Sequence, residues 1–288
     1  MSNCLMLNLW GKVLKLMPTQ CRGLYLQENQ PWEMAFIHAW KDAGHGELIG
    51  VPHATIMDWD TRYFFDPRSY LRKDLLSLPM PDLVAVNGSA MMNKYVEGRY
   101  PASALKEVEA LRYLYLADLN SVSPLGREHR SCLRVLVITD YFSEITRSQL
   151  VMLQKALPLI GEPLEIIVKP HPSCPVRMQD FPGIPMRVVS QPLETLWEGC
   201  DVVFSGNLTS AAVEAYEVGL PVVSVVDGRY SNQSSLRRCE GALFASTPEE
   251  LAKALIVATA TAHSPKGKRD FFILDSKLYH WRKILKLA

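Results

Sequence analysis

The chain has 288 residues, of which 48% are hydrophobic and 21% charged, and this describes a globular protein long enough for two domains. A formal net charge of +1 provides no general basic field, so the composition does not suggest a partner made of nucleic acid. The six cysteines are widely spaced and lack a C-x-x-C pair, which argues against a disulfide scaffold and a zinc site and fits a reducing cytoplasm. No apolar run approaches the ~20 residues of a membrane span, and the cysteine pattern leads us to expect a cytoplasmic protein.

The first half of the chain alternates short apolar runs with helical patterns. Its opening segment, residues 1–17, lacks the small-residue cleavage site of a signal peptide. The patterns predict strands at 23–27, 48–51, 83–86 and 105–110, helices at 31–41 and 90–97, and a long functional loop or short helices at 56–78.

The second half begins after a polar segment, residues 117–131, which we interpret as an interdomain linker. The patterns predict strands at 133–138, 164–168, 187–189, 201–204 and 221–226 and helices at 143–157, 193–198, 211–218, 247–260 and 276–287. This alternation predicts an α/β protein with doubly wound parallel sheets. We expect one domain at residues 1–120 and a second at 121–288, whose last helix crosses back to the first.

Two polar motifs directly follow predicted strands. Lys169-Pro170-His171-Pro172 follows the strand at 164–168, and Ser205-Gly206-Asn207-Leu208-Thr209-Ser210 follows the strand at 201–204. Open α/β sheets bind ligands at the carboxyl ends of their strands, so both motifs are placed for binding. Thr209 and Ser210 also open a predicted helix, whose free N–H groups favour an anion. The two motifs together predict a phosphate site.

The pair His171-Pro172 and Thr209-Ser210 resembles the paired motifs of bacterial glycosyltransferases that use CMP-activated acidic sugars. The sialyltransferases and Kdo transferases of the two-Rossmann GT-B architecture carry such motifs, and CDP-glycerol glycerophosphotransferases carry a similar pair. The resemblance therefore implies a GT-B-like fold and a cytidine nucleotide. The implied activity is transfer of an acidic keto-sugar, such as a nonulosonic acid or Kdo, from a CMP-activated donor.

The whole chain also resembles the surface carbohydrate biosynthesis proteins of bacterial polysaccharide clusters. The residues that carry this likeness lie at 24–33, 50–55, 81–88 and 109–113. It implies a role in polysaccharide biosynthesis for the cell envelope, with a glycan or lipid-linked glycan as acceptor. A GT-B first domain normally opens with several strand–helix units before the position of residue 23, so we expect this domain to be abbreviated at its amino terminus.

The resemblance assigns the donor-binding roles within the second domain. His171 would neutralise or protonate the leaving phosphate, Thr209 and Ser210 would hold phosphate oxygens, and Glu214 would accept hydrogen bonds from ribose hydroxyls. The full donor-binding set is Lys169, His171, Pro172, Ser205, Gly206, Asn207, Thr209, Ser210 and Glu214. We expect neither a metal ion nor a cofactor, since the nucleotide sugar is itself the substrate.

Three residues compete for the role of the base that deprotonates the acceptor. Glu28 ranks first because it ends the first strand, where the resembled transferases carry an acidic motif, although no glycine follows here. His53 ranks second because it resembles the first-domain histidine of glycerophosphotransferases. Asp58, in Asp58-Trp59-Asp60, ranks third: the D-x-D form binds a metal–nucleotide in the other glycosyltransferase fold, which the parallel sheets argue against.

Other functions stay open at this point, and the first is a CDP-glycerol-type glycerophosphotransferase, which carries the similar motif pair. The chain also resembles NDP-sugar 2-epimerases in its serine–glycine turn before a Glu-bearing helix, with Glu28, Asp58, Asp60 and Arg62 as candidate cleft residues. A non-catalytic nucleotide-binding subunit is a third alternative. The basic amphipathic pattern at 276–287 fits either a terminal helix packed across to the first domain, which we favour, or a peripheral contact with the inner face of the cytoplasmic membrane.

Overall fold

A computed structural model describes residues 2–71, 77–119, 132–226, 228, 231–260 and 270–287. The chain forms two compact units. Unit 1 contains residues 1–56, 60–114 and 270–288, and unit 2 contains residues 57–59 and 115–269. The last segment of the chain therefore belongs to the same unit as the first.

Unit 1 is built on a four-stranded parallel sheet in the order β1-β2-β3-β4. Its strands are β1 (Arg22–Leu26), β2 (Glu47–Val51), β3 (Leu83–Val86) and β4 (Leu105–Glu107). The connections between them carry α2 (Pro31–Asp42), η1 (Thr61–Tyr63), α3 (Pro67–Tyr70), α4 (Ser89–Glu97) and η2 (Ala102–Ala104). Because successive strands lie side by side and parallel crossovers are right-handed, α2 and α4 cover the same face of the sheet.

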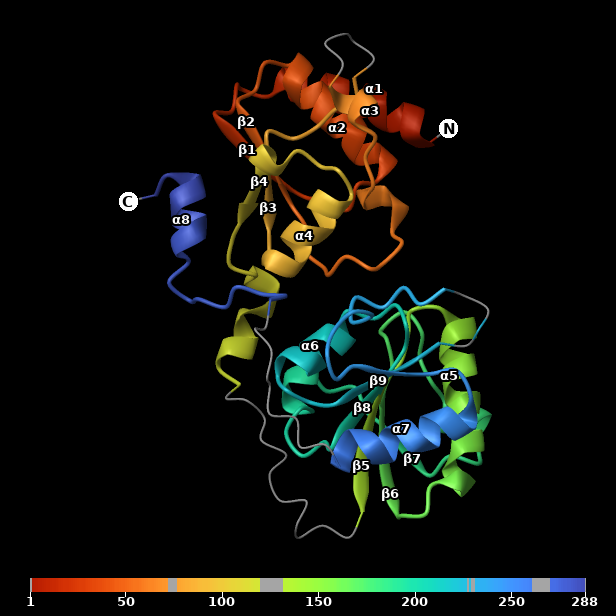
Figure 1. Ribbon diagram of the computed structural model, residues 1–288. Helices are drawn as coiled ribbons and strands as arrows, with labels where there is room; N and C mark the ends of the chain where they lie inside the picture. The colour runs from red at the N-terminus through yellow and green to blue at the C-terminus, as the bar shows by residue number, and fades with distance from the viewer. Residues whose placement is uncertain are drawn as a thin grey trace. The chain divides into compact units, whose positions relative to one another are not determined.

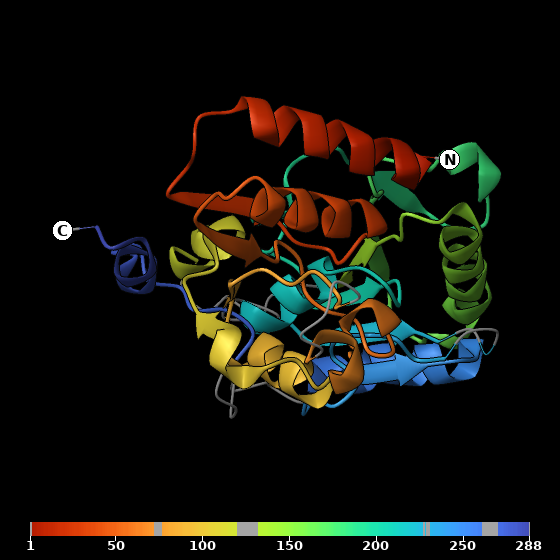
Figure 2. The ribbon, with the colours of Figure 1, turned by 90° about the horizontal axis from the view of Figure 1, so that it is seen from above.

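The amino-terminal helix α1 (Ser2–Leu16) packs on the outside of α2, and the two run beside each other in Figure 2. Trp10 of α1 meets Phe36 of α2 edge to face, with ring centroids 5.1 Å apart. Leu14 and Trp40 are buried in the same apolar cluster. The sequence analysis assigned no helix to this segment, so helix α1 is an element that it missed.

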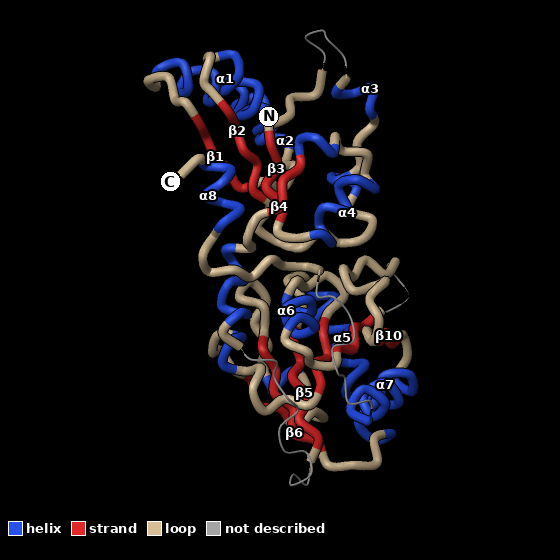
Figure 3. Tube along the Cα trace, turned by 60° about the vertical axis from the view of Figure 1, so that its left-hand side comes forward, coloured by secondary structure: helices blue, strands red, loops and turns tan. Residues whose placement is uncertain are grey.

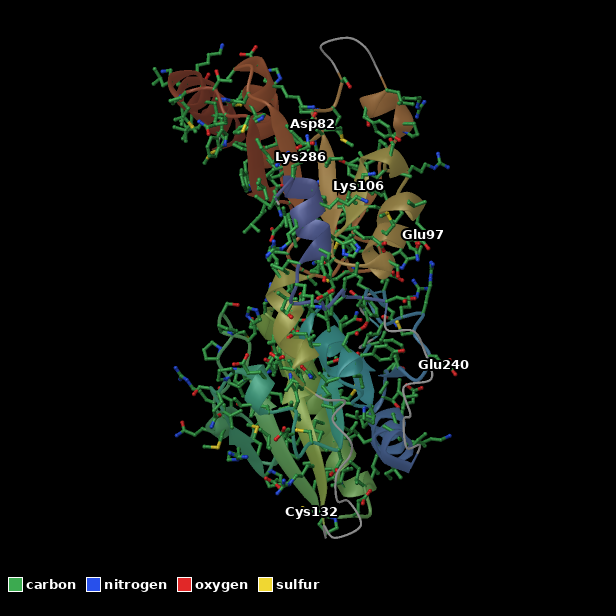
Figure 4. All side chains as sticks on the ribbon, turned by 90° about the vertical axis from the view of Figure 1, so that its left-hand side faces the viewer. Asp82, Glu97, Lys106, Cys132, Glu240 and Lys286 are labelled. Atoms are coloured by element: carbon green, nitrogen blue, oxygen red, sulfur yellow. The ribbon has the colours of Figure 1, made fainter. Side chains whose placement is uncertain are left out.

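The opposite face of the unit 1 sheet is covered by the carboxyl-terminal helix α8 (Tyr279–Leu285). Trp281 of α8 is buried against Ile49, Ala85 and Val108. Figure 4 labels Lys286, which directly follows α8, and Lys106, which lies on β4. The sequence predicted a terminal helix at residues 276–287; the structure has this helix, but only over Tyr279–Leu285.

A single buried carboxylate fastens α8 to the end of β4. The side chain of Glu109 is fully buried and accepts hydrogen bonds from the backbone N–H groups of His280 and Trp281 at 2.9 and 3.1 Å. The ring of His280 contacts the same carboxylate, with Nδ1 2.8 Å from Oε1. Burial disfavours the charged form of Glu109, but these hydrogen bonds outweigh it and hold its pKa below the usual value.

Unit 2 is built on a six-stranded parallel sheet in the order β10-β9-β8-β5-β6-β7. Its strands are β5 (Leu133–Ile138), β6 (Leu164–Lys169), β7 (Met186–Val188), β8 (Val202–Ser205), β9 (Val222–Val225) and β10 (Leu243–Ala245). The chain proceeds from β5 through β6 to β7 and then restarts beside β5 with β8. The direction of strand progression therefore reverses between β5 and β8.

This reversal places helices on both faces of the unit 2 sheet (Figures 1 and 3). Helix α5 (Ser143–Ala156) follows β5 and packs against α7 (Pro248–Ala260) on one face, while α6 (Ala211–Glu217) follows β8 on the other. The β-branched residues of β5, β6 and β8 form a continuous core with α5 and α7. The predicted doubly wound α/β class is therefore confirmed.

Some sequence-based expectations differ from the structure. The helix predicted at 193–198 is only a 3₁₀ turn, η7 (Leu193–Thr195), because Pro192 starts a turn and the segment is too short for α-helical propagation. Further 3₁₀ turns are η3 (Leu111–Ala117), η5 (Leu157–Leu159) and η6 (Met178–Asp180).

Most of the predicted interdomain linker, residues 120–131, lies outside the described residues. The six cysteines all lie within the described residues, and none of them forms a disulfide bond.

Among the described residues, no helix has both the length and the apolarity that crossing a membrane requires.

We predict that Glu109→Gln destabilises the protein by about 2 kcal/mol, since the amide accepts fewer hydrogen bonds and loses the charge that strengthens them. Because the folded-state pKa of Glu109 is depressed, its contribution is present above the ordinary carboxyl pKa of about 4.3 and is lost as the pH falls through the depressed value. Urea unfolding at pH 7 and pH 3 measures both effects. Glu107→Gln, on the half-buried end of β4, is the matched control. An equal loss of stability at both pH values would contradict this account.

Candidate functional site

Three strands of unit 2 end at the same level of the sheet. In the strand register, Ile138 of β5 pairs with Lys169 of β6 on one side and with Ser205 of β8 on the other. The loops that follow these strands therefore leave one edge together, at the point where strand progression reverses. Ligands of open α/β sheets bind at this position.

The loop after β5 is tied to the loop after β8 by Asp140. Its carboxylate is fully buried and accepts the N–H of Phe142 at 3.3 Å through Oδ1 and the N–H of Leu208 at 3.1 Å through Oδ2. A Cβ atom added at Gly206 would lie 3.0 Å from Oδ2, so a larger residue at this position would press against the Asp140 carboxylate. Burial raises the pKa of Asp140 above its usual value, although the hydrogen bonds from Phe142, Leu208 and Tyr141 oppose the shift.

The same loop also holds the predicted histidine. Thr139 accepts the backbone N–H of His171 through its hydroxyl at 3.1 Å. The imidazole Nδ1 lies 2.7 Å from the hydroxyl of Ser173, and the ring centroid lies 5.9 Å from that of Tyr141. These contacts fix the backbone and one ring nitrogen, Nδ1, of a half-buried histidine.

A cavity of about 560 Å³ opens beside these loops. Its walls come from the amino end of α5, the loop after β8, the end of β9 and the loop that follows β9; the lining residues are Phe142, Ser143, Glu144, Ile145, Ser148, Asn207, Leu208, Val225 and Gln233. The walls combine apolar side chains with a few polar groups, as in pockets for small molecules. Asn207 donates to the carbonyl of Ser231 at 3.2 Å, while its buried amide oxygen has no partner.

The remaining residues of the predicted donor set occupy different environments. Thr209 accepts the N–H of Ala211 at 3.3 Å, and Ser210 is the N-cap residue of α6 without a capping bond from its side chain. These two residues therefore lie at the amino end of a helix, as predicted. The ammonium of Lys169 donates to the carbonyl of Ser190 at 2.9 Å, and Pro172 is exposed. The hydroxyl of Ser205 is fully buried and lies 2.8 Å from that of Ser224, so it joins two strands.

Glu214, on the first turn of α6, is buried and accepts a hydrogen bond from the hydroxyl of Tyr115. Burial and the neighbouring Glu214 carboxylate raise the pKa of Tyr115, so the tyrosine stays protonated and donates. A ribose hydroxyl would have to share or replace this donor. Sequence reasoning did not identify Tyr115, because it lies 99 residues from its partner.

Unit 1 brings together two of the three residues proposed as the base. Glu28 follows β1 and His53 follows β2, and His53 Nε2 lies 3.4 Å from Glu28 Oε1. Both side chains are partly exposed. The loop that carries Glu28 is fixed by the buried carboxylate of Glu33, which accepts the N–H groups of Glu28 and Asn29 at 2.9–3.1 Å. Burial raises the pKa of Glu33 in spite of these bonds.

The third base candidate, Asp58, lies in unit 2 rather than unit 1. Its side chain is 5% exposed and its carboxylate lies 3.9 Å from the guanidinium of Arg237. Asp60 is bound by Arg62, with Oδ2 2.6 Å from Nη2. No group of three or more His, Cys, Asp or Glu side chains within the described ranges could hold a metal ion.

Sequence reasoning missed Thr139 and Asp140, although they follow a buried strand just as His171 does. The position alone was therefore a usable signal. Their roles depend on backbone groups of distant loops, which no local pattern reveals.

Comparisons with known proteins identify the fold. No protein-family model and no curated protein matches the chain. Among solved structures, a UDP-GlcNAc 2-epimerase of Methanocaldococcus jannaschii in complex with UDP-GlcNAc and UDP is 14% identical, with a TM-score of 0.62 over 99% of this chain and 81% of that one. S. aureus MnaA with UDP is 12% identical, with a TM-score of 0.61 over 99% and 80% of the two chains. A glycosyltransferase from Rickettsia africae is 11% identical, with a TM-score of 0.52 over 98% and 81%. At these identities the likeness establishes a GT-B-like fold of two Rossmann-type units.

We predict that the stability of the Asp140→Asn variant, measured relative to that of the wild type, increases as the pH rises. A carboxyl with a raised folded-state pKa contributes stability below its unfolded pKa of about 3.9, and this is lost as the pH rises through the folded value. The difference in Tm, variant minus wild type, should therefore be larger at pH 7 than at pH 4, with about 2–4 °C for each kcal/mol.

Circular-dichroism melts measure this difference, with the exposed Asp180→Asn as control. A Tm difference that shrinks between pH 4 and pH 7 would show that the fold stabilises the ionised form instead.

Proposed function

We propose that the chain is a metal-independent glycosyltransferase of bacterial surface polysaccharide biosynthesis. Its donor is a CMP-activated acidic keto-sugar, such as a nonulosonic acid or Kdo, and its acceptor is a glycan or lipid-linked glycan. The observation that carries this proposal is the joint anchoring of the His171 and Leu208 loops by Thr139 and Asp140. The GT-B-like neighbours that hold UDP or UDP-GlcNAc support a nucleotide sugar as the ligand of this fold.

The strand-end edge of unit 2 supplies the groups that departure of a phosphate requires. A glycosyl bond breaks as negative charge develops on the leaving phosphate, so hydrogen-bond donors held in place beforehand lower the barrier. His171 has its backbone and Nδ1 fixed, and its Nε2 is the donor we assign to the leaving CMP. Thr209 and Ser210 provide hydroxyls at the next loop but one.

The cavity beside this edge has the size and lining for the rest of the donor. Its volume of about 560 Å³ lies in the usual range for small-molecule sites, about 300–1,000 Å³. Glu144 and Ser148 offer polar contacts on the α5 wall, and Leu208 and Val225 provide apolar ones. A sugar with its attached groups fits this mixture.

The carboxylates favour transfer over epimerisation. Removing and returning a proton at a sugar carbon requires acid–base groups on both faces of the ring, whereas transfer requires one base for the acceptor hydroxyl. Asp60 is bound to Arg62, and Asp58 is buried facing Arg237. Of the four residues considered for an epimerase, Glu28 is the carboxylate left partly exposed, and it lies beside His53.

A sugar-nucleotide 2-epimerase is the second candidate, because the most similar structures reported above include UDP-GlcNAc 2-epimerases. The two reactions are distinguished in D₂O. An epimerase incorporates deuterium at C2 of UDP-GlcNAc, while a CMP-sugar transferase leaves that position unlabelled.

We expect the wild-type protein to bind CMP in the presence of EDTA, and to bind it more tightly than UDP. We also expect His171→Ala to lower kcat by about 10²-fold, which is the scale for removing one acid or electrostatic group. The variant should keep the wild-type Tm, because His171 lies on a loop and not in the core. Calorimetry and a transfer assay measure these effects. Binding that requires Mg²⁺ or Mn²⁺, or a marked preference for UDP, would argue against the proposal.

For the base, we expect Glu28→Gln to reduce transfer by about 10²-fold or more while CMP affinity is retained, since the amide keeps the shape but cannot take a proton. His53→Ala and Asp58→Asn are measured beside it. Normal transfer by Glu28→Gln, with loss in one of the other two variants, would assign the base to that residue.

A further inference from the structure

The segment Met57–Trp59 belongs to unit 2 and packs against the loop that follows β9. The backbone N–H of Asp58 donates to the carbonyl of Gln233 at 3.0 Å. Gln233 is also a lining residue of the cavity in unit 2. The segment therefore holds one wall of that cavity, a role that the Asp58-Trp59-Asp60 motif did not suggest.

The side chains of this segment orient one arginine. Asp58 is 5% exposed, and its carboxylate lies 3.9 Å from the guanidinium of Arg237. The same guanidinium lies over the indole of Trp59, with its carbon 5.5 Å from the ring centroid. Arg237 follows Gln233 by about one turn, with its N–H bonded to the carbonyl of Ser234, and its side chain remains 38% exposed. A buried carboxylate and an aromatic face thus fix a guanidinium that solvent can still reach.

Trp59 itself is held in an unfavourable arrangement. Its φ of 62° lies in the left-handed region, which residues other than glycine rarely adopt. The residue is 58% exposed, so burial of the indole does not explain the conformation. Strained backbone that presents an exposed side chain is typical of binding sites, because the surrounding contacts maintain the strain for function.

The cavity in unit 2 is lined by one charged side chain and by uncharged residues. Glu144 is the one charged side chain among its described lining residues, so the lining itself offers no cation to an anionic ligand. Arg237, four residues after the lining residue Gln233, carries a cation that is partly exposed. Guanidinium groups bind carboxylates with paired hydrogen bonds, and an indole face packs on the C–H groups of a sugar ring.

We propose that Trp59 and Arg237 form a subsite for an anionic sugar, in which Arg237 binds the carboxylate and Trp59 stacks on the ring. Asp58 is a positioning residue that orients the guanidinium. This inference rests on the proposed function and gives it a substrate class based on the residues of this chain.

The test compares N-acetylneuraminic acid with its neutral methyl ester by ligand-observed NMR, in wild type and variants. In wild type the acid should bind about tenfold or more tightly than the ester. Arg237→Gln should bring this ratio close to one, and Arg237→Lys should lower it, because lysine lacks the planar fork. Trp59→Ala should weaken both ligands equally. Arg238→Gln, an exposed neighbour of the same charge, should leave the ratio unchanged.

CMP affinity is measured in the same samples, and it separates this inference from the proposed function. The guanidinium could instead bind the phosphate; in that case Arg237→Gln would weaken CMP and leave the acid-to-ester ratio intact, which overturns the sugar subsite. Equal binding of acid and ester by a wild type that binds CMP overturns it as well, while failure to bind CMP contradicts the proposed function. Should Arg237→Gln unfold because the buried Asp58 carboxylate loses this ion pair, the double variant Asp58→Asn/Arg237→Gln carries the same expectation.

Discussion

The candidate site depends on one buried carboxylate, that of Asp140. Parallel sheets place strand ends at one edge, but the loops beyond those ends are held only by what their own atoms contact. Asp140 uses one oxygen for its own loop and the other for the loop after β8, and Thr139 beside it holds the loop after β6. The raised pKa of Asp140 shows that its desolvation is not fully offset. A stability cost at the point where three loops meet is typical of a site selected for function.

Unit 1 also contains buried carboxylates that accept hydrogen bonds from backbone N–H groups of neighbouring segments. Glu33 fixes the loop that presents Glu28, and Glu109 fixes the terminal helix α8. Their pKa values move in opposite directions, since burial outweighs the hydrogen bonds for Glu33 and the hydrogen bonds outweigh burial for Glu109. Each carboxylate joins segments that the sheet alone leaves unconnected.

The sequence predicted those features that depend on local patterns. The β-branched runs identified most strands, and polar residues directly after them identified the edge that carries His171 and Thr209. The sequence did not predict the roles of Asp140 and Tyr115. The hydrogen-bond partner of Asp140 in the loop after β8 lies 68 residues away along the chain, and the partner of Tyr115 lies 99 residues away. Asp58 was interpreted as a base from its motif, and only the fold reveals its pairing with Arg237. Side-chain partners across long sequence separations are set by packing, which hydrophobic periodicity does not encode.

The central claim is that the carboxyl edge of β5, β6 and β8 binds the nucleotide of a CMP-activated sugar. Hydrogen–deuterium exchange with and without saturating CMP tests it directly, because ligand binding slows the opening of the backbone that it contacts. The account predicts slower exchange in peptides covering residues 139–148, 170–174 and 206–211, with little change along β7 and β10. Slower exchange confined to unit 1, or none at a CMP concentration that calorimetry shows to be saturating, would contradict it.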